Sequence, residues 1–369
     1  MIRAQDHIAG IVPYKPGKPI SELSRELGID HIIKLASNEN PVGPSPKAVA
    51  ALKEALDEGG LHRYPDGGGF YLKEALSARW GLSPDHFILG NGSNEVIEFL
   101  CRTFLGPGEE VVAADLTFVV YRLITTAAGG RIVEVPLKDH RHDLPAMADA
   151  VGPDTRMLFI CNPNNPTGTY NTEGEVESLL SRVPDDLIVV FDEAYAEYAT
   201  APDYPNTLPI LNERPNTVIL RTFSKVYGIP ALRIGYGVTS PEIVDLMNRV
   251  RQPFNANELA QRAALAALSD DAHVRASLAV NEAGKVQLAK LFDGLGLVHL
   301  PTEANFVYVN VGMDGGPVFE ACLKRGVIIR HIHGDWVRVT IGLPEELDRF
   351  AEVLTEVLPE VRAAHEANG

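Results

Sequence analysis

The sequence has few cysteines, no long apolar run and no excess of positive charge, and each of these absences excludes a class of protein. Its three cysteines, Cys101, Cys161 and Cys322, lie far apart in a chain of 369 residues, so neither a disulfide framework nor a clustered metal site is predicted. No apolar run approaches transmembrane or signal-peptide length, which predicts a cytoplasmic protein with no membrane partner. A formal net charge of −16 argues against a nucleic-acid partner, because the two molecules would repel each other.

The remaining composition is that of a globular protein, with 45% hydrophobic and 22% charged residues. A chain of this length predicts two domains, because a single core rarely grows so large. The predicted strands are 87–89, 111–114, 131–135, 157–161, 187–191, 217–221 and 234–238, and the predicted helices are 46–58, 70–80, 94–104, 117–128 and 172–182. This alternation predicts an α/β fold, with a mostly parallel seven-stranded sheet covered by helices on both faces.

The C-terminal third of the chain has a different pattern. A long helical tract, about 241–293, is followed by shorter predicted strands at 306–309, 327–330 and 337–341, mixed with helices. This pattern predicts a smaller α+β domain, joined by the Pro-rich N-terminal segment. The predicted units are an arm at 1–45, which belongs to the small domain and to dimer contacts, a large domain at 46–270 and a small domain at 271–369.

One lysine stands at the end of a predicted strand, between groups that suit it for chemistry. Ser224 and Lys225 follow the apolar run 217–220, and Arg233 comes eight residues after the lysine. A lysine amine can form a Schiff base with an aldehyde cofactor, while a hydroxyl and an arginine hold that cofactor's phosphate. The same residues would also suit an ordinary surface loop, so this interpretation needs support from the rest of the chain.

Polar residues follow other predicted strands of the same sheet, and in parallel sheets these strand ends meet where ligands bind. Strand 87–89 leads into Gly90-Asn91-Gly92-Ser93-Asn94, whose free amides at a helix start would suit a phosphate. Asn165 precedes a proline, so its backbone is extended and its amide can project into the crevice. Asp192 closes an apolar strand and needs a partner such as a protonated pyridine nitrogen, and Tyr195 lies three residues further on.

In this order along the chain, these pieces resemble the fold-type-I pyridoxal-phosphate aminotransferases, essentially from end to end. The motifs that carry the resemblance are PYKPGKP at 13–19, KLASNENPVGPSP at 34–46, RYPDGGGFYLKEAL at 63–76, LGNGSNEVIE at 89–98, TFVVY at 117–121, NPNNPTG at 162–168, FDEAY at 191–195 and FSKVYG…LRIGYG at 223–237. The resemblance implies pyridoxal 5′-phosphate as cofactor, small amine and 2-oxo acid substrates, and a homodimer.

The resemblance also implies roles for individual residues. Lys225 would carry the cofactor, Asp192 would pair with its pyridine nitrogen, and Asn165 and Tyr195 would bond its ring oxygen. Phe118 would stack on the ring. The expected phosphate ligands are Ser93, Asn94, Ser224, Arg233 and, from the neighbouring subunit, Tyr64. The expected ligands of the substrate's anionic group are Arg338, assisted by Arg330, Tyr14 and Asn38.

The implied reaction is transamination between L-histidinol phosphate and 2-oxoglutarate, which gives imidazole acetol phosphate and L-glutamate. Aromatic amino acids as amino donors, or decarboxylation of threonine phosphate, are alternatives on the same machinery. The segment from Arg330 to Arg338 departs from the family pattern and leaves the substrate open. It contains His331 and His333, but no third ligand is apparent, so no metal is predicted. Transcription regulators with an aminotransferase-like domain would need an added DNA-binding domain, for which this chain is too short.

Overall fold

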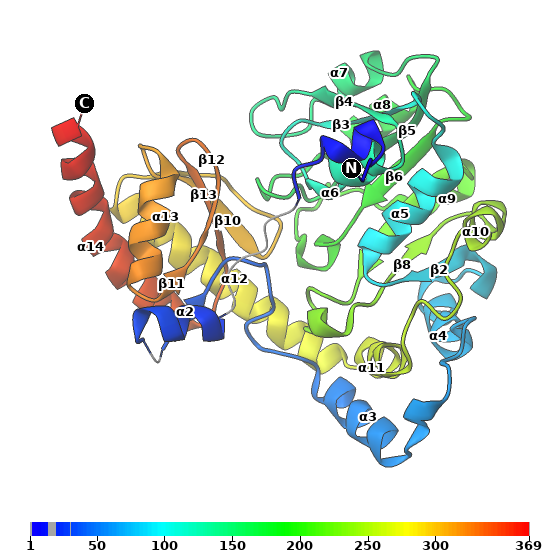
Figure 1. Ribbon diagram of the computed structural model, residues 1–369, viewed down its shortest axis with the longest axis horizontal. Coiled ribbons are helices and arrows are strands. Elements are labelled where there is room, and N and C mark those ends of the chain that lie inside the picture. Colours follow the sequence, from blue (N-terminus) through cyan, green and yellow to red (C-terminus); the bar gives the residue numbers. More distant parts are fainter. Residues whose placement is uncertain (1, 14–19, 30, 369) are drawn as a thin grey trace.

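The computed structural model describes residues 2–13, 20–29 and 31–368 and arranges them as two layered units that share one long helix (Figure 1). The larger unit is built on a seven-stranded sheet in the order β2-β8-β7-β6-β5-β3-β4. Its strands are β2 (Phe87–Gly90), β3 (Glu110–Ala114), β4 (Arg131–Val135), β5 (Thr155–Cys161), β6 (Ile188–Asp192), β7 (Thr217–Thr222) and β8 (Gly235–Val238). All neighbours are parallel except β8, which is antiparallel to both β2 and β7. The predicted mostly parallel seven-stranded sheet is confirmed.

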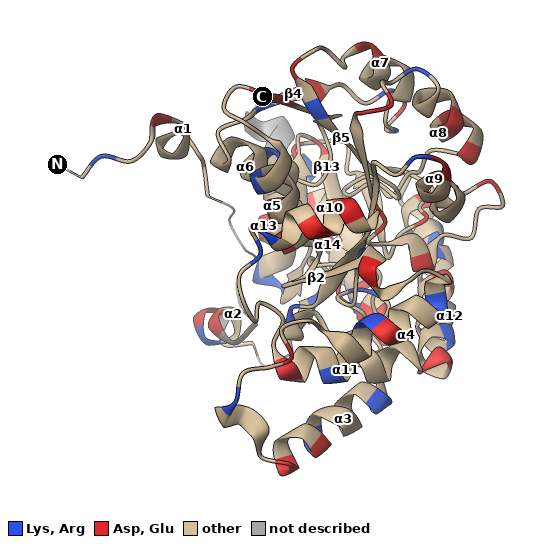
Figure 2. Cartoon of the chain, turned by 90° about the vertical axis from the view of Figure 1, so that its right-hand side faces the viewer, with Lys and Arg blue, Asp and Glu red and all other residues tan. Residues whose placement is uncertain are grey.

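Helices cover both faces of this sheet because its central strands are apolar on both sides. On β5, Phe159 packs in one core with residues of α5, α6 and α10, and its neighbour Ile160 packs in another with residues of α7 and α8. The helices of this unit are α3 (Pro46–Asp57), α4 (Phe70–Trp80), α5 (Ser93–Phe104), α6 (Val120–Ala127), α7 (Leu144–Asp149), α8 (Glu173–Leu180), α9 (Thr207–Glu213), α10 (Pro241–Asn248) and α11 (Glu258–Leu268), with single turns η1 (Gly60–His62), η2 (Pro84–His86), η3 (Ala196–Tyr198) and η4 (Pro230–Leu232). Acidic and basic residues are interspersed on outer helices such as α3, α4 and α11 (Figure 2).

The predicted helical tract 241–293 is wrong in one respect, because the chain forms three helices there. After α10 and α11 comes α12 (Asp271–Gly294), and both later helices start at a side-chain cap. Asn257 accepts a hydrogen bond from Ala260 N, and Asp270 accepts one from His273 N. Such residues satisfy amides that have no partner inside the helix, so they mark a start. Between α10 and α11, Pro253 and Phe254, which has a left-handed backbone (φ 58°), prevent one continuous helix.

The smaller unit is α+β, as predicted. Its antiparallel sheet has the order β12-β13-β10-β9, and a separate parallel pair joins β1 to β11. Its elements are β1 (Ile33–Lys34), β9 (Val298–His299), β10 (Phe306–Asn310), β11 (Val327–Ile328), β12 (Arg330–His333), β13 (Trp336–Thr340), α13 (Gly315–Lys324) and α14 (Pro344–Asn368), to which the N-terminal segment adds α2 (Ile20–Leu27). The first helix, α1 (Asp6–Ala9), lies instead against α6 of the larger unit. The predicted strand 327–330 is therefore two short strands with different partners. Among the described helices, none is long and apolar enough to cross a membrane.

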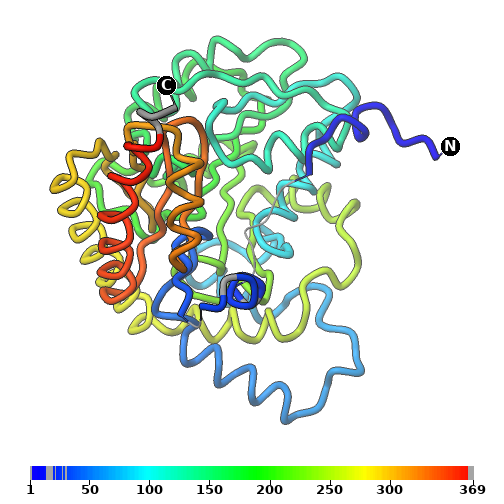
Figure 3. Tube along the Cα trace, turned by 60° about the vertical axis from the view of Figure 1, so that its left-hand side comes forward, coloured from blue at the N-terminus to red at the C-terminus, as the bar shows by residue number. Residues whose placement is uncertain are grey.

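Helix α12 connects the two units and lies beside the C-terminal helix α14 (Figure 3). Its far end contributes Leu288 and Phe292 to the core of the smaller unit. At its near end Asp270 accepts a hydrogen bond of 2.6 Å from Ser45 Oγ, just before α3. The predicted domain boundaries at residues 45 and 270 remain a prediction.

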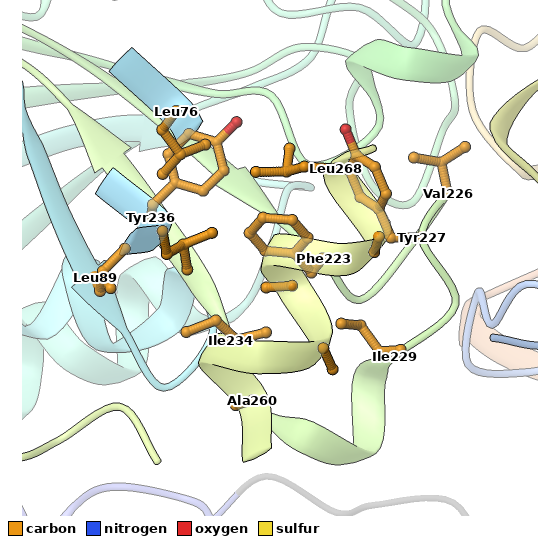
Figure 4. Close-up of a cluster of buried hydrophobic side chains, with 14 of the residues drawn as sticks. Leu76, Leu89, Phe223, Val226, Tyr227, Ile229, Ile234, Tyr236, Ala260 and Leu268 are labelled. Atoms are coloured by element: carbon orange, nitrogen blue, oxygen red, sulfur yellow. The ribbon is translucent and has the colours of Figure 1, made fainter. Parts of the chain in front are cut away.

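The turn that carries Lys225 is held by a hydrophobic core on both sides (Figure 4). Phe223, Val226, Tyr227 and Ile229 are buried in the cluster that includes Ile234 and Tyr236 of the following strand region. Gly228, in the same turn, has a φ of 69°, and a Cβ there would lie 2.0 Å from Gly43 O, so only glycine fits this close approach. This packing fixes the backbone from which the lysine side chain extends.

Candidate active site

A cavity of about 300 Å³ lies at the carboxyl edge of the large sheet, between the two units. It collects residues that are far apart in the sequence. The predicted site residues that line it are Asn38, Ser93, Asn94, Phe118, Asn165, Asp192, Tyr195, Ser224, Lys225, Arg233, Arg330 and Arg338. The structure thus brings together all the predicted residues except Tyr14, which lies outside the described residues, and Tyr64.

Lys225 enters this cavity from the turn after β7. The side chain is half-buried, and its Nζ lies 5.4 Å from the centroid of the Tyr195 ring. Burial lowers the pKa of the Lys225 amine to about 8, and the positive charges of Arg338 and Arg233 act in the same direction. A larger fraction of this amine is therefore neutral near pH 7 than for a solvent-exposed lysine, and a neutral amine is both a nucleophile and a base.

Asp192 lies at the end of β6 and is only 2% exposed. Its Oδ2 accepts a 2.6 Å hydrogen bond from Tyr121 Oη, and its Oδ1 accepts one from Ala194 N. Burial raises the pKa of Asp192 to about 6, and the two hydrogen bonds partly oppose that rise. A carboxylate in such a place gains most from a positively charged ligand atom beside it.

The opposite end of the cavity has the features of an anion site. Helix α5 begins at Ser93, so the amides of its first turn have no helical partners. Arg233, which has a left-handed backbone (φ 58°), bonds Asn91 O through Nη2, and a Cβ on Gly92 would lie only 2.7 Å from that nitrogen. A Cβ on Gly235 would lie 2.5 Å from Ser93 N. The guanidinium, the helix start and β8 are therefore packed too closely for any side chain between them.

A second group of polar residues links the cavity to the smaller unit. Asn38, with a φ of 54°, donates from Nδ2 to Tyr195 Oη at 2.9 Å, and its own N–H donates to Thr340 Oγ1 at 2.9 Å. Arg338, 9% exposed, donates from Nη1 to Asn165 Oδ1 and from Nη2 to Ala36 O. Burial raises the pKa of Tyr195 well above its ordinary value, so its hydroxyl stays protonated and can donate.

The departing segment 330–338 forms the β12–β13 hairpin. Arg330 lines the cavity, whereas the His331 ring bonds Gly334 O within the hairpin and packs against Gly315. His333 is exposed. Within residues 2–13, 20–29 and 31–368, no group of three or more His, Cys, Asp or Glu side chains could hold a metal ion. Arg330, His331 and Ile332 of β12 border a further cavity of about 630 Å³. This cavity shares Phe118, Asn165, Arg330 and Arg338 with the first.

The sequence did not predict a second set of residues, which hold the predicted ligands or their neighbours in place by hydrogen bonds. Tyr121 was quoted only as the end of the TFVVY motif, although it is fully buried against Asp192. Glu95, which follows Asn94 in the LGNGSNEVIE motif, accepts from Asn91 N and from Asn255 Nδ2 through Oε2. Asn164 accepts from Thr117 and bonds the buried His142. The only feature of the sequence that could have indicated these three residues is that each is a polar residue within a motif that also contains a predicted ligand.

Comparison with known proteins defines the class first. The model of the family "Aminotransferase class I and II" matches residues 30–354, so the chain belongs to this family. It is 50% identical to a histidinol-phosphate aminotransferase of Moorella thermoacetica, over 96% of this chain and 93% of the relative, and 48% identical to a histidinol-phosphate aminotransferase 2 of Pseudomonas fluorescens, over 96% and 97%. Among solved structures it is similar to the histidinol-phosphate aminotransferase of Sinorhizobium meliloti in complex with pyridoxal 5′-phosphate, with a TM-score of 0.89, 27% identity and coverage of 98% of this chain and 99% of that one.

Proposed function

We propose that this chain is a pyridoxal-phosphate-dependent aminotransferase that transfers the amino group of L-histidinol phosphate to 2-oxoglutarate, giving imidazole acetol phosphate and L-glutamate. The names of the close relatives support this substrate. The observation that carries the proposal is the meeting of Lys225, Asp192 and Arg338 in one cavity. Transfer of an amino group between anionic substrates requires a neutral amine to move the proton, a carboxylate to pair with the cofactor's ring nitrogen and a guanidinium to bind the substrate's anionic group.

The residues present fit the cofactor. Asp192, buried and with a raised pKa, would pair with the cationic ring nitrogen, and Phe118 would lie against the ring. Ser93, Asn94, Ser224 and Arg233 would hold the phosphate at the start of α5. Asn165 and Tyr195 are the proposed partners of the ring oxygen. The close packing at Gly92 and Gly235 supports this cradle, because a side chain at either position would displace the phosphate ligands.

When bound, pyridoxal 5′-phosphate supplies an aldehyde that binds amino groups and a ring that stabilises negative charge on the adjoining carbon. Lys225 Nζ then removes the proton from the substrate carbon that carries the amino group. The lowered pKa of Lys225 suits it for this step near neutral pH. Asp192 stays ionised beside the ring cation, and the Tyr195 hydroxyl, held by Asn38 Nδ2, orients its hydrogen bond toward the site.

Arg338 is the proposed ligand of the anionic group on both substrates. Histidinol phosphate has no α-carboxylate, so its phosphate must use the place that the α-carboxylate of glutamate uses. A planar guanidinium can bind both shapes through two parallel hydrogen bonds. Asn165 Oδ1 and Ala36 O hold the fork of Arg338, and Arg330 on β12 lines the same cavity.

The enzyme is proposed to act as a homodimer in which Tyr64 reaches the neighbouring site. In the single chain Tyr64 is 82% exposed and lies outside its own cavity. Leu61, Phe70 and Tyr71 in the same stretch are also largely exposed, and large apolar side chains gathered on a surface are typical of an interface. A second copy would bury them and bring the Tyr64 hydroxyl to a phosphate.

Aromatic amino acids are a second candidate class of amino donor. The cavity of about 630 Å³ beside the site has apolar walls that include Val119, Leu123 and Ile332, which would accept a phenyl ring. To test both, the purified protein is assayed for glutamate formation from 2-oxoglutarate with histidinol phosphate, phenylalanine or threonine phosphate. A kcat/KM for histidinol phosphate far above that for phenylalanine is expected. A preference for phenylalanine would replace the proposed substrate, and carbon dioxide release from threonine phosphate would replace the reaction.

A further inference from the structure

Phe254 has a backbone conformation that a large side chain rarely adopts. Its φ of 58° lies in the left-handed region, where a bulky residue other than glycine or asparagine is an outlier. Such strain persists only where the surroundings enforce it, and it is concentrated at functional positions. The residue precedes Asn255 in the loop between α10 and α11, outside the cavity described above.

The strained backbone places the Phe254 ring against Tyr64. The two rings are stacked, with centroids 4.6 Å apart and planes inclined by 19°. Phe254 is 45% exposed and Tyr64 is 82% exposed, so this contact is not part of a hydrophobic core. A Cβ on Gly67 would lie 3.2 Å from Phe254 Cδ1, which shows how closely the Tyr64 loop passes over the ring.

Hydrogen bonds tie the two loops to each other. Gln261 Nε2 donates to Asp66 O in the Tyr64 loop at 2.9 Å and to Ala256 O in the Phe254 loop at 2.8 Å. The Asp66 carboxylate accepts from Gly68 N and Phe70 N, which fixes the rest of the Tyr64 loop. The position of Tyr64 is therefore set from the loop between α10 and α11.

The same loop is fixed to the chain's own phosphate-binding end. Asn255 Nδ2 donates to Glu95 Oε2 at 2.6 Å and to Leu89 O at 3.0 Å, and Asn91 Nδ2 donates to Asn255 O at 3.2 Å. Glu95 and Asn91 flank Ser93 and Asn94 at the start of α5. The loop between α10 and α11 thus joins the anion site of one subunit to a tyrosine that is 82% exposed on the surface of that subunit.

From this geometry we infer that Phe254 is a positioning residue for the neighbouring active site: its ring, held by a strained backbone, orients Tyr64 toward the phosphate bound in the second copy of the chain. The inference rests on the proposed function, in which Tyr64 acts across the dimer. An exposed tyrosine has two free side-chain torsions, and a stacked neighbour removes most of that freedom before the dimer forms. Phe254 thereby lowers the entropic cost of the contact.

Three variants test the contact through cofactor affinity, measured by titrating the apoprotein with pyridoxal 5′-phosphate. Tyr64→Phe and Phe254→Gly should each weaken affinity by about tenfold, and the double variant should be no weaker than either one alone. Glycine suits a positive φ, so Phe254→Gly should fold without loss of thermal stability. Phe254→Tyr keeps a ring at the position and should retain wild-type affinity. Independent, additive losses would overturn the inference.

Hybrid dimers distinguish action on the neighbouring site from damage to the subunit's own site. In the first hybrid, one subunit carries Lys225→Ala and the other carries Phe254→Gly. Its only site with Lys225 receives Tyr64 from the subunit with an intact Phe254, so about half of the wild-type activity is expected. In the control hybrid both substitutions are on one subunit, and its only site with Lys225 receives the misplaced Tyr64. At a cofactor concentration near the wild-type Kd, where a tenfold loss of affinity lowers activity, equal activities of the two hybrids would overturn the inference.

Failure of the inference and of the proposed dimer are separable. If Tyr64→Phe has wild-type cofactor affinity, or if sedimentation velocity shows a monomer, the role of Tyr64 across the dimer is wrong and Phe254 loses its proposed role with it. If Tyr64→Phe weakens cofactor binding but Phe254→Gly does not, only the inference about Phe254 is wrong. The choice of amino donor is tested separately and depends on neither result.

Discussion

The hydroxyl of Tyr121 donates a hydrogen bond of 2.6 Å to Asp192 Oδ2, and both side chains are buried. The Tyr121 ring stacks on Phe159 of β5 with centroids 4.6 Å apart, so the phenol has little freedom to turn away. A phenol that donates to a carboxylate stabilises the ionised form of that carboxylate. Tyr121 therefore opposes the desolvation that raises the pKa of Asp192.

Tyr121→Phe should raise the pKa of Asp192 further and reduce turnover. The ring is kept, so packing changes little, but Asp192 loses its closest hydrogen bond. A fall in kcat of about tenfold is expected, since a hydrogen bond to a charged group is worth roughly 1.5–3 kcal/mol. The acidic limb of the kcat/KM profile should move to higher pH. A lower kcat with an unmoved acidic limb would mean that Tyr121 acts only through packing.

Asp192→Asn should keep the cofactor bound but reduce turnover severely. The amide cannot keep the ring nitrogen protonated, whereas the proposed phosphate ligands Ser224 and Arg233 are unchanged. The loss is expected to reach several kcal/mol of barrier, where each ~1.4 kcal/mol is a factor of ten in rate. Turnover at saturating cofactor is the decisive measurement. A wild-type rate there, with only cofactor affinity reduced, would contradict the role of Asp192.

Asp192 also predicts a pH dependence of apoprotein stability with an unusual sign. Burial raises its pKa from 3.8 to about 6, so the native state holds this proton more tightly than the unfolded chain does. Stability from this group is fully present below pH 3.8 and is lost as the pH rises to about 6. The free energy of unfolding of wild type relative to Asp192→Asn should therefore fall across this window, as measured by urea titration. A constant difference would mean that Asp192 titrates normally.

Lys225→Ala should abolish amino transfer and leave the fold intact. The side chain is half-buried in a cavity, and the turn is held by Phe223, Val226 and Ile229, which the substitution does not touch. In the wild type, borohydride should attach the cofactor irreversibly to this lysine, detectable as a mass increase on the peptide that contains it. Circular dichroism should be unchanged in the variant. Turnover at the wild-type rate would end the assignment.

The fold could be predicted from the sequence because its signals are local and repeated. The central strands β5, β6 and β7 are apolar runs that are largely buried, and α4 begins and ends at Phe70 and Trp80, where the pattern placed it. The tract 241–293 was wrong because apolar periodicity continues across α10, α11 and α12. The caps Asn257 and Asp270 mark the breaks, but the same residue types also occur inside helices.

The pattern of the sheet could predict the cavity residues that lie at strand ends or a few residues beyond them. Lys225, Asp192 and Asn165 do so, and the parallel sheet brings such strand ends together. Tyr121 could not be found in this way, because its direction depends on where α6 begins. The predicted helix starts at 117 and the observed one at Val120, which changes the face that each residue presents. Phe254 was missed because no pattern in a single sequence indicates a positive φ at a phenylalanine.

Arg338 is the proposed ligand of the anionic group on both substrates, and its removal should impair both half-reactions. The guanidinium lies in the middle of β13 and is fixed by Asn165 and Ala36, so it is ordered before any anion binds. Arg338→Ala should cost about 2–5 kcal/mol, for histidinol phosphate and for glutamate alike, because it removes a charge-assisted contact from a partly desolvated site. Arg338→Lys should recover only part of the loss, since an ammonium lacks the planar fork.

Arg330→Ala is the matched control for Arg338, because the residue lines the same cavity from the neighbouring strand β12. If Arg330 serves only one of the two anions, its removal should affect the two substrates unequally. Single-turnover rates with each amine, followed through the cofactor's absorption band, distinguish these cases. Equal losses for both amines in Arg338→Ala and unequal losses in Arg330→Ala would assign the shared anion to Arg338. An unchanged rate with glutamate in Arg338→Ala would place the anion site elsewhere in the cavity.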